Sequence, residues 1–167
     1  MSDAVLDAGP LIHLAELGAL DVLSDLELLL IPDSVWVEVD AHQPQALMKS
    51  ELPLQRETVQ LPSANLVALA QALMLDQGEI DALSIMETFP HAIFLTDDAA
   101  ARLAAEQRGY QVYGTIGLLI RSVRKGYKTP KQVIKFLRSI PSQSTLFIRP
   151  GLLDAILQHL KDEWKIK

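Results

Sequence analysis

The sequence contains no cysteine and no long apolar run, and each absence excludes a class of protein. Without cysteine there is no disulfide framework, no thiolate metal site and no cysteine nucleophile. No apolar run approaches the roughly 18 residues of a membrane span, and the first residues lack the basic region of a signal peptide. We therefore expect a soluble cytoplasmic protein with no membrane partner.

Basic residues are scarce in the first part of the chain. Residues 1–101 contain 17 Asp or Glu and only two Lys or Arg, whereas residues 102–167 contain 13 Lys or Arg and four Asp or Glu. Such a separation lets an acidic part hold cations and a basic part hold polyanions. Solvated helix faces explain the same asymmetry equally well, so composition alone leaves both interpretations open.

Length and composition predict one folded domain that spans residues 1–167. Nearly half of the residues are apolar and 22% are charged, which is typical of a globular chain with a substantial core. Short apolar segments alternate with helical patterns along the sequence. This alternation favours an α/β fold, a three-layer α/β/α arrangement with a mainly parallel central sheet. The predicted strands are 4–6, 26–32, about 58–61, 92–96 and 110–114.

The helical patterns are punctuated by Gly and Pro. One helix is expected just after Gly9 and Pro10, a second from Asp33, and two more from Asn65 that break at Gly78. Another should follow residues 97–98 and end at Gly109. From about residue 114 we expect a basic helical C-terminal portion. It comprises two amphipathic helices separated at 126–130 and a last helix over about 150–161.

Five carboxylates lie at places where such a fold binds ligands. Asp7, Asp97 and Asp98 follow predicted strands, and Glu38 and Asp81 lie near the starts of predicted helices. Ligands of parallel sheets bind at the carboxyl ends of the strands. Several carboxylates converge there only if a cation offsets their repulsion, and all-oxygen ligation indicates Mg²⁺ or Mn²⁺. For the Asp97–Asp98 pair, simple helix capping is the alternative interpretation.

The order of four motifs resembles the PIN-domain family. These motifs are "VLDAGPLIHLAELGALDVL", "LLLIPDSVWVEV", "LDQGEIDALSI" and "IFLTDD". The chain is most similar to a bacterial branch of nuclease-like and toxin proteins, which share a tail resembling "VYGTIGLLIRSVRKG". The resemblance covers essentially the whole chain and implies a PIN-like fold. One departure is Gly9, where many PIN domains have Ser or Thr.

The resemblance assigns catalytic and metal-binding roles to particular acids. Asp7 matches the first metal-binding aspartate, Glu38 the following glutamate, and Asp98 the aspartate two residues after Thr96, which takes a supporting role. Asp97 fills the variable position between them and is either a helix cap or a further metal contact.

The third acid of the motif has two candidates. Glu79 and Asp81 lie about 200° apart around a regular helix, so they do not both point into one site. The family pattern favours Asp81 as the catalytic and metal-binding acid, which leaves Glu79 as a supporting acid at the start of the helix.

The activity implied by the resemblance is metal-dependent cleavage of single-stranded RNA. The substrate would be held by the basic segment that contains Arg121, Arg124, Lys125 and Lys128, since phosphate contacts give affinity without sequence choice. The resemblance also implies two protein partners, a second copy of the chain and a small antitoxin. The alternative is a nucleic-acid-binding or partner-binding module with the same fold and little catalysis.

Overall fold

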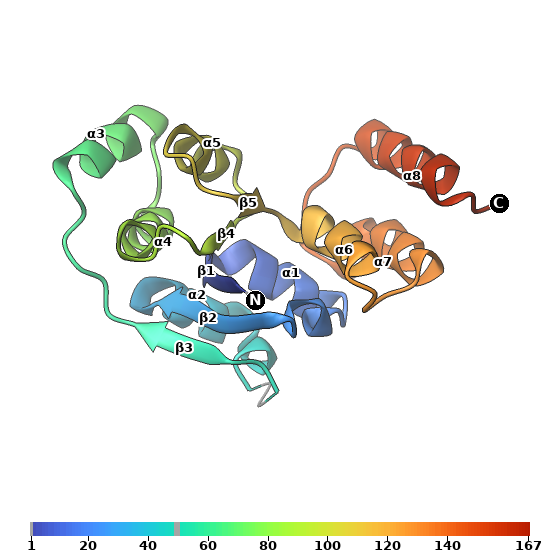
Figure 1. Cartoon of the computed structure of the whole chain (residues 1–167), viewed down its shortest axis with the longest axis horizontal. Helices are drawn as coiled ribbons and strands as arrows, with labels where there is room; N and C mark the ends of the chain where they lie inside the picture. Colours follow the sequence, from blue (N-terminus) through green and yellow to red (C-terminus); the bar gives the residue numbers. More distant parts are fainter. Residues whose placement is uncertain (1, 49–50) are drawn as a thin grey trace.

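The computed structural model describes residues 2–48 and 51–167 and contains a five-stranded sheet in which every neighbouring pair of strands is parallel. The strand order is β3-β2-β1-β4-β5 (Figure 1). The strands are β1 (Ser2–Leu6), β2 (Leu26–Pro32), β3 (Leu54–Glu57), β4 (Ile93–Leu95) and β5 (Val112–Tyr113). The parallel sheet predicted from the alternating pattern is therefore confirmed.

Helices cover both faces of this sheet. The bounds are α1 (Ala8–Glu16), α2 (Asp33–His42), α3 (Ala64–Leu73), α4 (Gln77–Thr88), α5 (Ala99–Gln107), α6 (Thr115–Arg124), α7 (Pro130–Gln143) and α8 (Pro150–Trp164), with short 3₁₀ turns at Leu20–Leu23 and Pro44–Ala46. Among the described residues, no helix has the length and apolar character needed to cross a bilayer.

Successive residues of the strands point to opposite faces of the sheet and pack into two hydrophobic cores. Val5 of β1 and Phe94 of β4 point to the face covered by α3, α4 and α5. Leu6 and Leu95, one residue further along, point to the face covered by α1, α2, α6 and α7, and α8 packs on α7. Because both faces are covered, the strands read as continuous apolar runs, as expected for a buried parallel sheet. The three-layer α/β/α prediction is confirmed.

Two element boundaries differ from the sequence-based expectation. The strand expected at 58–61 is absent there, and β3 lies earlier, at Leu54–Glu57, where it pairs with β2 as an edge strand. Pro53 precedes it directly, a position that an edge strand tolerates because one side of the strand has no ladder partner. The carbonyl oxygen of Pro53 still takes part in the pairing with β2, since it accepts the backbone N–H of Leu29 across 2.9 Å.

The break between α3 and α4 also differs from the prediction. It lies at residues 74–76, and Gly78 is inside α4. Met74 adopts a left-handed conformation (φ 53°) that ends α3, and the side chain of Asp76 caps α4. A capping aspartate satisfies the first N–H groups of a helix, so the break does not need the glycine.

Candidate active site

Asp7 lies at the carboxyl end of β1, on the central strand of the sheet. Its Oδ1 accepts the N–H of Ala8 across 2.8 Å, and its Oδ2 accepts the hydroxyl of Thr96 across 2.9 Å. Thr96 is fully buried just after β4, and Asp7 is only 8% exposed. The same hydroxyl accepts the backbone N–H of Asp98 across 3.1 Å. The hydroxyl of Thr96 thus joins the ends of β1 and β4 through hydrogen bonds with Asp7 and with the backbone of Asp98.

Glu79 and Asp76 form the second part of the site, at the start of α4. Each accepts the other's backbone N–H across 2.9 Å, which is a capping box. Glu79 is only 8% exposed, whereas Asp76 is exposed. Oε2 of Glu38, on α2, and Oδ1 of Asp76 both lie within 4 Å of the position that a Cβ on Gly78 would take. The exposed carboxylates of Glu38 and Asp76 therefore lie on the same side of α4, next to Gly78.

The charges of these groups act on one another. Burial raises the pKa of Asp7 to about 6, against the hydrogen bonds from Ala8 and Thr96, and the negative charges of Asp76 and Glu38 raise it further. Burial likewise raises the pKa of Glu79 to about 7, with contributions from the charges of Asp76, Asp98 and Asp7. We call these five acids the carboxylate cluster: Asp7, Glu38, Asp76, Glu79 and Asp98.

Asp97 and Asp98 each cap a different helix. Oδ1 of Asp98 accepts the N–H of Ala101 across 2.8 Å and so begins α5. Oδ1 of Asp97 accepts the N–H of Thr115 and Oδ2 its hydroxyl, both across 2.6 Å, at the start of α6. Oδ2 of Asp97 also lies 2.7 Å from Nδ1 of His13. Both oxygens of Asp97 are therefore used within the fold, whereas Oδ2 of Asp98 makes no hydrogen bond with the described residues.

Gly9 and Gly114 leave room for Asp97. A Cβ on Gly9 would lie 3.4 Å from both Cβ and Oδ2 of Asp97, and a Cβ on Gly114 would lie 2.7 Å from its Oδ1. A Cβ on Gly114 would therefore clash with Asp97, whereas a Cβ on Gly9 would only touch it.

Asp81 and Glu79, the two candidates for the third acid, have different surroundings in the structure. Oδ2 of Asp81 accepts the hydroxyl of Ser34 across 2.5 Å, and Oδ1 accepts the side-chain amide of Gln77 across 2.7 Å. Its neighbours are thus polar side chains of α2 and α4, and it is Glu79 whose charge couples to Asp7 and Asp98. The family resemblance thus favours Asp81 as the third acid of the site, whereas the charge coupling in the structure favours Glu79.

Asp76 was missed by the reasoning from sequence. It precedes α4 rather than following a strand, so the search for acids at strand ends passed over it. Its signal was the spacing Asp76–Glu79, an acid three residues before a glutamate at a helix start, which is the pattern of a capping box.

The basic residues predicted to hold RNA lie at the opposite edge of the sheet. Arg121 is 7% exposed and forms a two-pronged ion pair with Asp25, which directly precedes β2. Lys128 pairs with Asp21 in the same region. Helix α6 begins at the carboxyl ends of the strands and runs back along them. Arg124 and Lys125 are exposed and lie at its far end, about 15 Å from its first residue.

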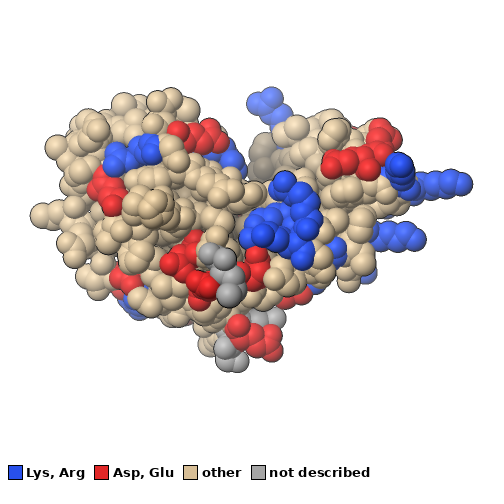
Figure 2. Space-filling model, in the orientation of Figure 1, with Lys and Arg blue, Asp and Glu red and all other residues tan. Residues whose placement is uncertain are grey.

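That these four basic residues hold RNA remains a prediction, and the structure gives their positions and contacts. Arg121 and Lys128 stabilise the fold through ion pairs, and Arg124 and Lys125 lie away from the carboxylate cluster. On the face drawn in Figure 2, Lys and Arg side chains gather over the half built from α6, α7 and α8, beside a group of Asp and Glu side chains.

Comparison with known proteins identifies the family. The model of a family described as DUF3368, PIN domain, matches residues 3–162. The chain belongs to this PIN-domain family. A solved structure of a PilT N-terminus domain protein from the hyperthermophilic archaeon Sulfolobus solfataricus P2 is similar in fold, with a TM-score of 0.53 and 14% sequence identity over 72% of this chain and 92% of that one. Comparison with curated proteins found no match.

PIN domains are usually nucleases and typically use divalent metal ions, so the cluster can be tested for its fit to such an ion. Its donors are carboxylate oxygens only, the ligands that Mg²⁺ and Mn²⁺ prefer. Within residues 2–48 and 51–167, no three His, Asp or Glu side chains are grouped closely enough to hold a metal ion as they stand. The donor chemistry of this PIN domain therefore fits a hard cation, and the side chains would have to move together to bind one.

Proposed function

We propose that this PIN domain is a metal-dependent endoribonuclease whose active site is the carboxylate cluster. The observation that carries the proposal is the gathering of five acids at the carboxyl edge of the parallel sheet, two of them buried with a raised pKa. Helix capping explains single members of the cluster, namely Asp7, Asp98 and the pair of Asp76 and Glu79. It does not offset the mutual repulsion and the burial of several carboxylates, which binding of a cation would offset.

The burial and contacts of the residues in the cluster suggest a different role for each. Asp7, Glu38 and Asp98 would hold Mg²⁺ or Mn²⁺, with Glu79 and Asp76 beside them. When bound, such an ion supplies polarisation of a phosphodiester and activation of water for in-line attack. Thr96 fixes the orientation of Asp7 through its hydroxyl, and the capping box fixes Glu79. RNA as the substrate is supported by the family resemblance of the acidic motifs.

The test is cleavage of a fluorescently labelled single-stranded RNA with Mn²⁺ and with EDTA. We expect cleavage only with the metal, and loss of cleavage in Asp7→Asn and Asp98→Asn. Both residues cap helices, and asparagine caps as well as aspartate, so the variants should stay folded. Asp33→Asn, an exposed acid of α2 paired with Arg56, is the matched control and should cleave as the wild type does. Cleavage in EDTA, or in both cluster variants, would overturn the proposal.

One observation favours a second candidate, a nucleic-acid-binding module with little catalysis. The side chains of the cluster stand too far apart to share an ion among the described residues. Under this candidate RNA binding would be salt-sensitive, and Mn²⁺ would stimulate no cleavage at any concentration tested.

A role as the toxin of a toxin–antitoxin pair belongs to the same proposal and rests on the resemblance alone. Induced expression in a bacterial host should then stop growth, and Asp7→Asn should restore it. Growth that is equally unaffected by both proteins would overturn the toxin role without touching the nuclease assignment.

A further inference from the structure

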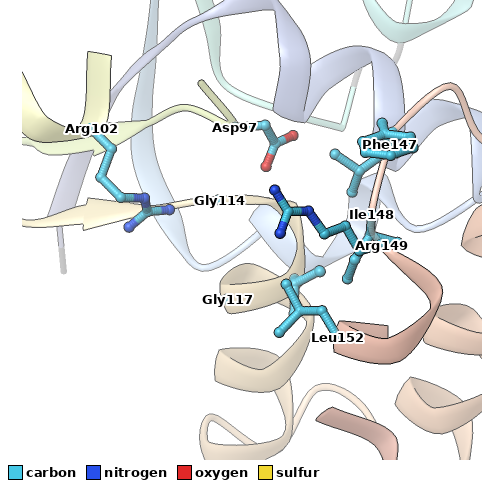
Figure 3. A pocket seen from close by; sticks show the side chains of 10 residues that line it. Asp97, Arg102, Gly114, Gly117, Phe147, Ile148, Arg149 and Leu152 are labelled. Atoms are coloured by element: carbon cyan, nitrogen blue, oxygen red, sulfur yellow. The ribbon is translucent and has the colours of Figure 1, made fainter. Parts of the chain in front are cut away.

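A pocket lies beside the carboxylate cluster, between the start of α6 and the segment that leads into α8 (Figure 3). Its volume is about 520 Å³, enough for a ligand the size of a nucleotide. The lining residues are Asp97, Arg102, Gly114, Ile116, Gly117, Leu146, Phe147, Ile148, Arg149 and Leu152.

Two arginines supply positive charge to this pocket. Figure 3 shows the guanidinium groups of Arg102, from α5, and Arg149, which precedes α8, directed toward the space next to Gly114. Arg102 has only a weak contact with Glu106, at 3.9 Å. For Arg149, no carboxylate of the described part of the chain lies within ion-pair distance. Both guanidinium groups are thus free to bind an anion, for which their planar donor geometry suits phosphate.

Gly114 keeps the arginine close to the backbone. A Cβ at this position would lie 3.0 Å from Nη2 of Arg102 and 2.7 Å from Oδ1 of Asp97. The first N–H of α6 is already bound by Asp97, so the helix end is not the anion-binding element. The positive charge of the pocket comes from side chains that sequence reasoning did not select, because they stand apart from the basic segment.

The opposite wall of the pocket is apolar and exposed. Phe147 is 83% exposed and Leu152 is 54% exposed, although both are large apolar residues. An exposed aromatic ring beside arginines is the combination with which proteins hold single-stranded nucleic acid, because the ring stacks on a base while the cations contact phosphates.

Asp97 links the pocket to the carboxylate cluster. This residue lines the pocket, is followed directly by Asp98, and lies against Gly9, two residues after Asp7. The pocket is therefore next to the residues at which we propose that RNA is cleaved.

We propose that this pocket binds the nucleotide next to the cleaved bond of single-stranded RNA, with Arg102 and Arg149 on the phosphate and Phe147 stacked on the base. The inference rests on the proposed function, since it names the place where the substrate of that nuclease is held. An acidic peptide would use the same arginines. The position of the pocket beside the proposed nuclease site, together with the exposed ring of Phe147, favours RNA.

The test is the binding of a labelled eight-nucleotide oligouridylate, followed by fluorescence anisotropy in Ca²⁺ between about 50 and 200 mM NaCl, with the RNA checked for integrity on a gel. Arg149→Ala and Arg102→Ala should each raise Kd about tenfold at the lowest salt and reduce the slope of log Kd against log salt by about 0.7. Arg138→Ala removes the same charge from an exposed site on α7 and should change Kd less than twofold.

Replacement of the aromatic ring separates stacking from charge. Phe147→Ala should raise Kd at least about fivefold with an unchanged salt slope, and Phe147→Trp should restore the wild-type Kd. Phe147→Leu should not restore it, because leucine keeps an apolar surface but cannot stack. Equal restoration by leucine would overturn the stacking role.

Other outcomes distinguish this inference from the nuclease assignment. Wild-type RNA binding by both arginine variants, with Mn²⁺-dependent cleavage intact, would overturn the pocket and leave the nuclease. Weakened binding by these variants in a protein that never cleaves would support the pocket and overturn the nuclease. If Arg149→Ala abolished binding of a labelled peptide of alternating Glu and Leu but left RNA binding unchanged, the pocket would be a peptide site and the proposal would fail.

Discussion

The hydroxyl of Thr96 donates a hydrogen bond to Oδ2 of Asp7 across 2.9 Å and joins the ends of two neighbouring strands. Because the same oxygen accepts the N–H of Asp98, one buried side chain sets the positions of two acids of the cluster. A hydroxyl can both donate and accept, which no apolar residue of similar size can do. The site therefore depends on a residue that itself carries no charge.

Thr96→Val should test this dependence. Valine has nearly the same volume but leaves a buried oxygen of Asp7 without its donor, so we expect a loss of about 1–3 kcal/mol in the free energy of unfolding, measured by urea denaturation. Mn²⁺-dependent cleavage should fall about 10- to 100-fold, as for other residues that orient ligands. Thr96→Ser keeps the hydroxyl and should retain most of the activity. A valine variant with wild-type activity would show that Asp7 needs no such support.

The choice between Glu79 and Asp81 as the third acid of the site gives a second prediction. Glu79→Gln keeps the capping box, since glutamine can also accept the N–H of Asp76, but removes a charge from the cluster. Cleavage should fall about 10- to 100-fold. Asp81→Asn keeps acceptors for Ser34 and Gln77 and should cleave within about twofold of the wild type. The measurement is the initial rate of cleavage for each variant at identical metal and RNA concentrations. A larger loss of rate in Asp81→Asn than in Glu79→Gln would assign the catalytic role to Asp81.

Substitutions of Asp97 and Asp98 should have different effects, the first on the stability of the fold and the second on metal binding. Asp97→Asn weakens contacts to Thr115 and His13, so it should lower the melting temperature in EDTA, by an amount equivalent to about 1–2 kcal/mol. The rise in melting temperature on adding Mn²⁺ should persist. Asp98→Asn should melt as the wild type does in EDTA and show a smaller rise with Mn²⁺, because a ligand stabilises only the state that binds it. Equal metal responses in the two variants would contradict this division.

Much of the fold was predictable because buried parallel strands have a simple signature. The segments at β1, β2 and β4 are dominated by buried apolar residues, and each was expected within one or two residues. Asp7 and Asp98 follow from the same reasoning, since the ends of adjacent parallel strands meet at one edge. β3 could not be placed in this way, because its half-exposed residues at the sheet edge lack the apolar run.

The composition of the site was less predictable, and the reasons are local. Which of Glu79 and Asp81 faces Asp7 depends on the rotation of α4. Glu79 is buried on the same face of α4 as Ala82, Leu83 and Met86. The role of Arg121 depends on Asp25, which is 96 residues away in sequence. A cluster of basic residues in a sequence gives their charge but not the edge of the sheet at which a helix presents them.

The ion pair between Asp25 and Arg121 gives a prediction for pH. Their side chains are 10% and 8% exposed and share two hydrogen bonds, at 2.9 and 2.5 Å. Burial raises the pKa of Asp25, but the hydrogen bond and the positive charge of Arg121 outweigh it, so the pKa lies below the ordinary value of 3.8. The unfolded chain therefore binds a proton at this residue at a higher pH than the folded chain. The stabilisation is fully present above the ordinary pKa and is lost as the pH falls through the folded-state pKa.

Asp25→Asn should accordingly lose about 3 kcal/mol in the free energy of unfolding near neutral pH, because Arg121 stays buried without its partner charge. The difference from the wild type should shrink as the pH is lowered below the ordinary aspartate pKa, which urea denaturation at a series of pH values measures. Asp21→Asn is the matched control. Its pair with Lys128 is on the surface, with Asp21 59% exposed, and its loss should cost less than about 1 kcal/mol at every pH. A difference for Asp25→Asn that stays constant down to the acid transition would mean that this pair carries no charge-dependent stabilisation.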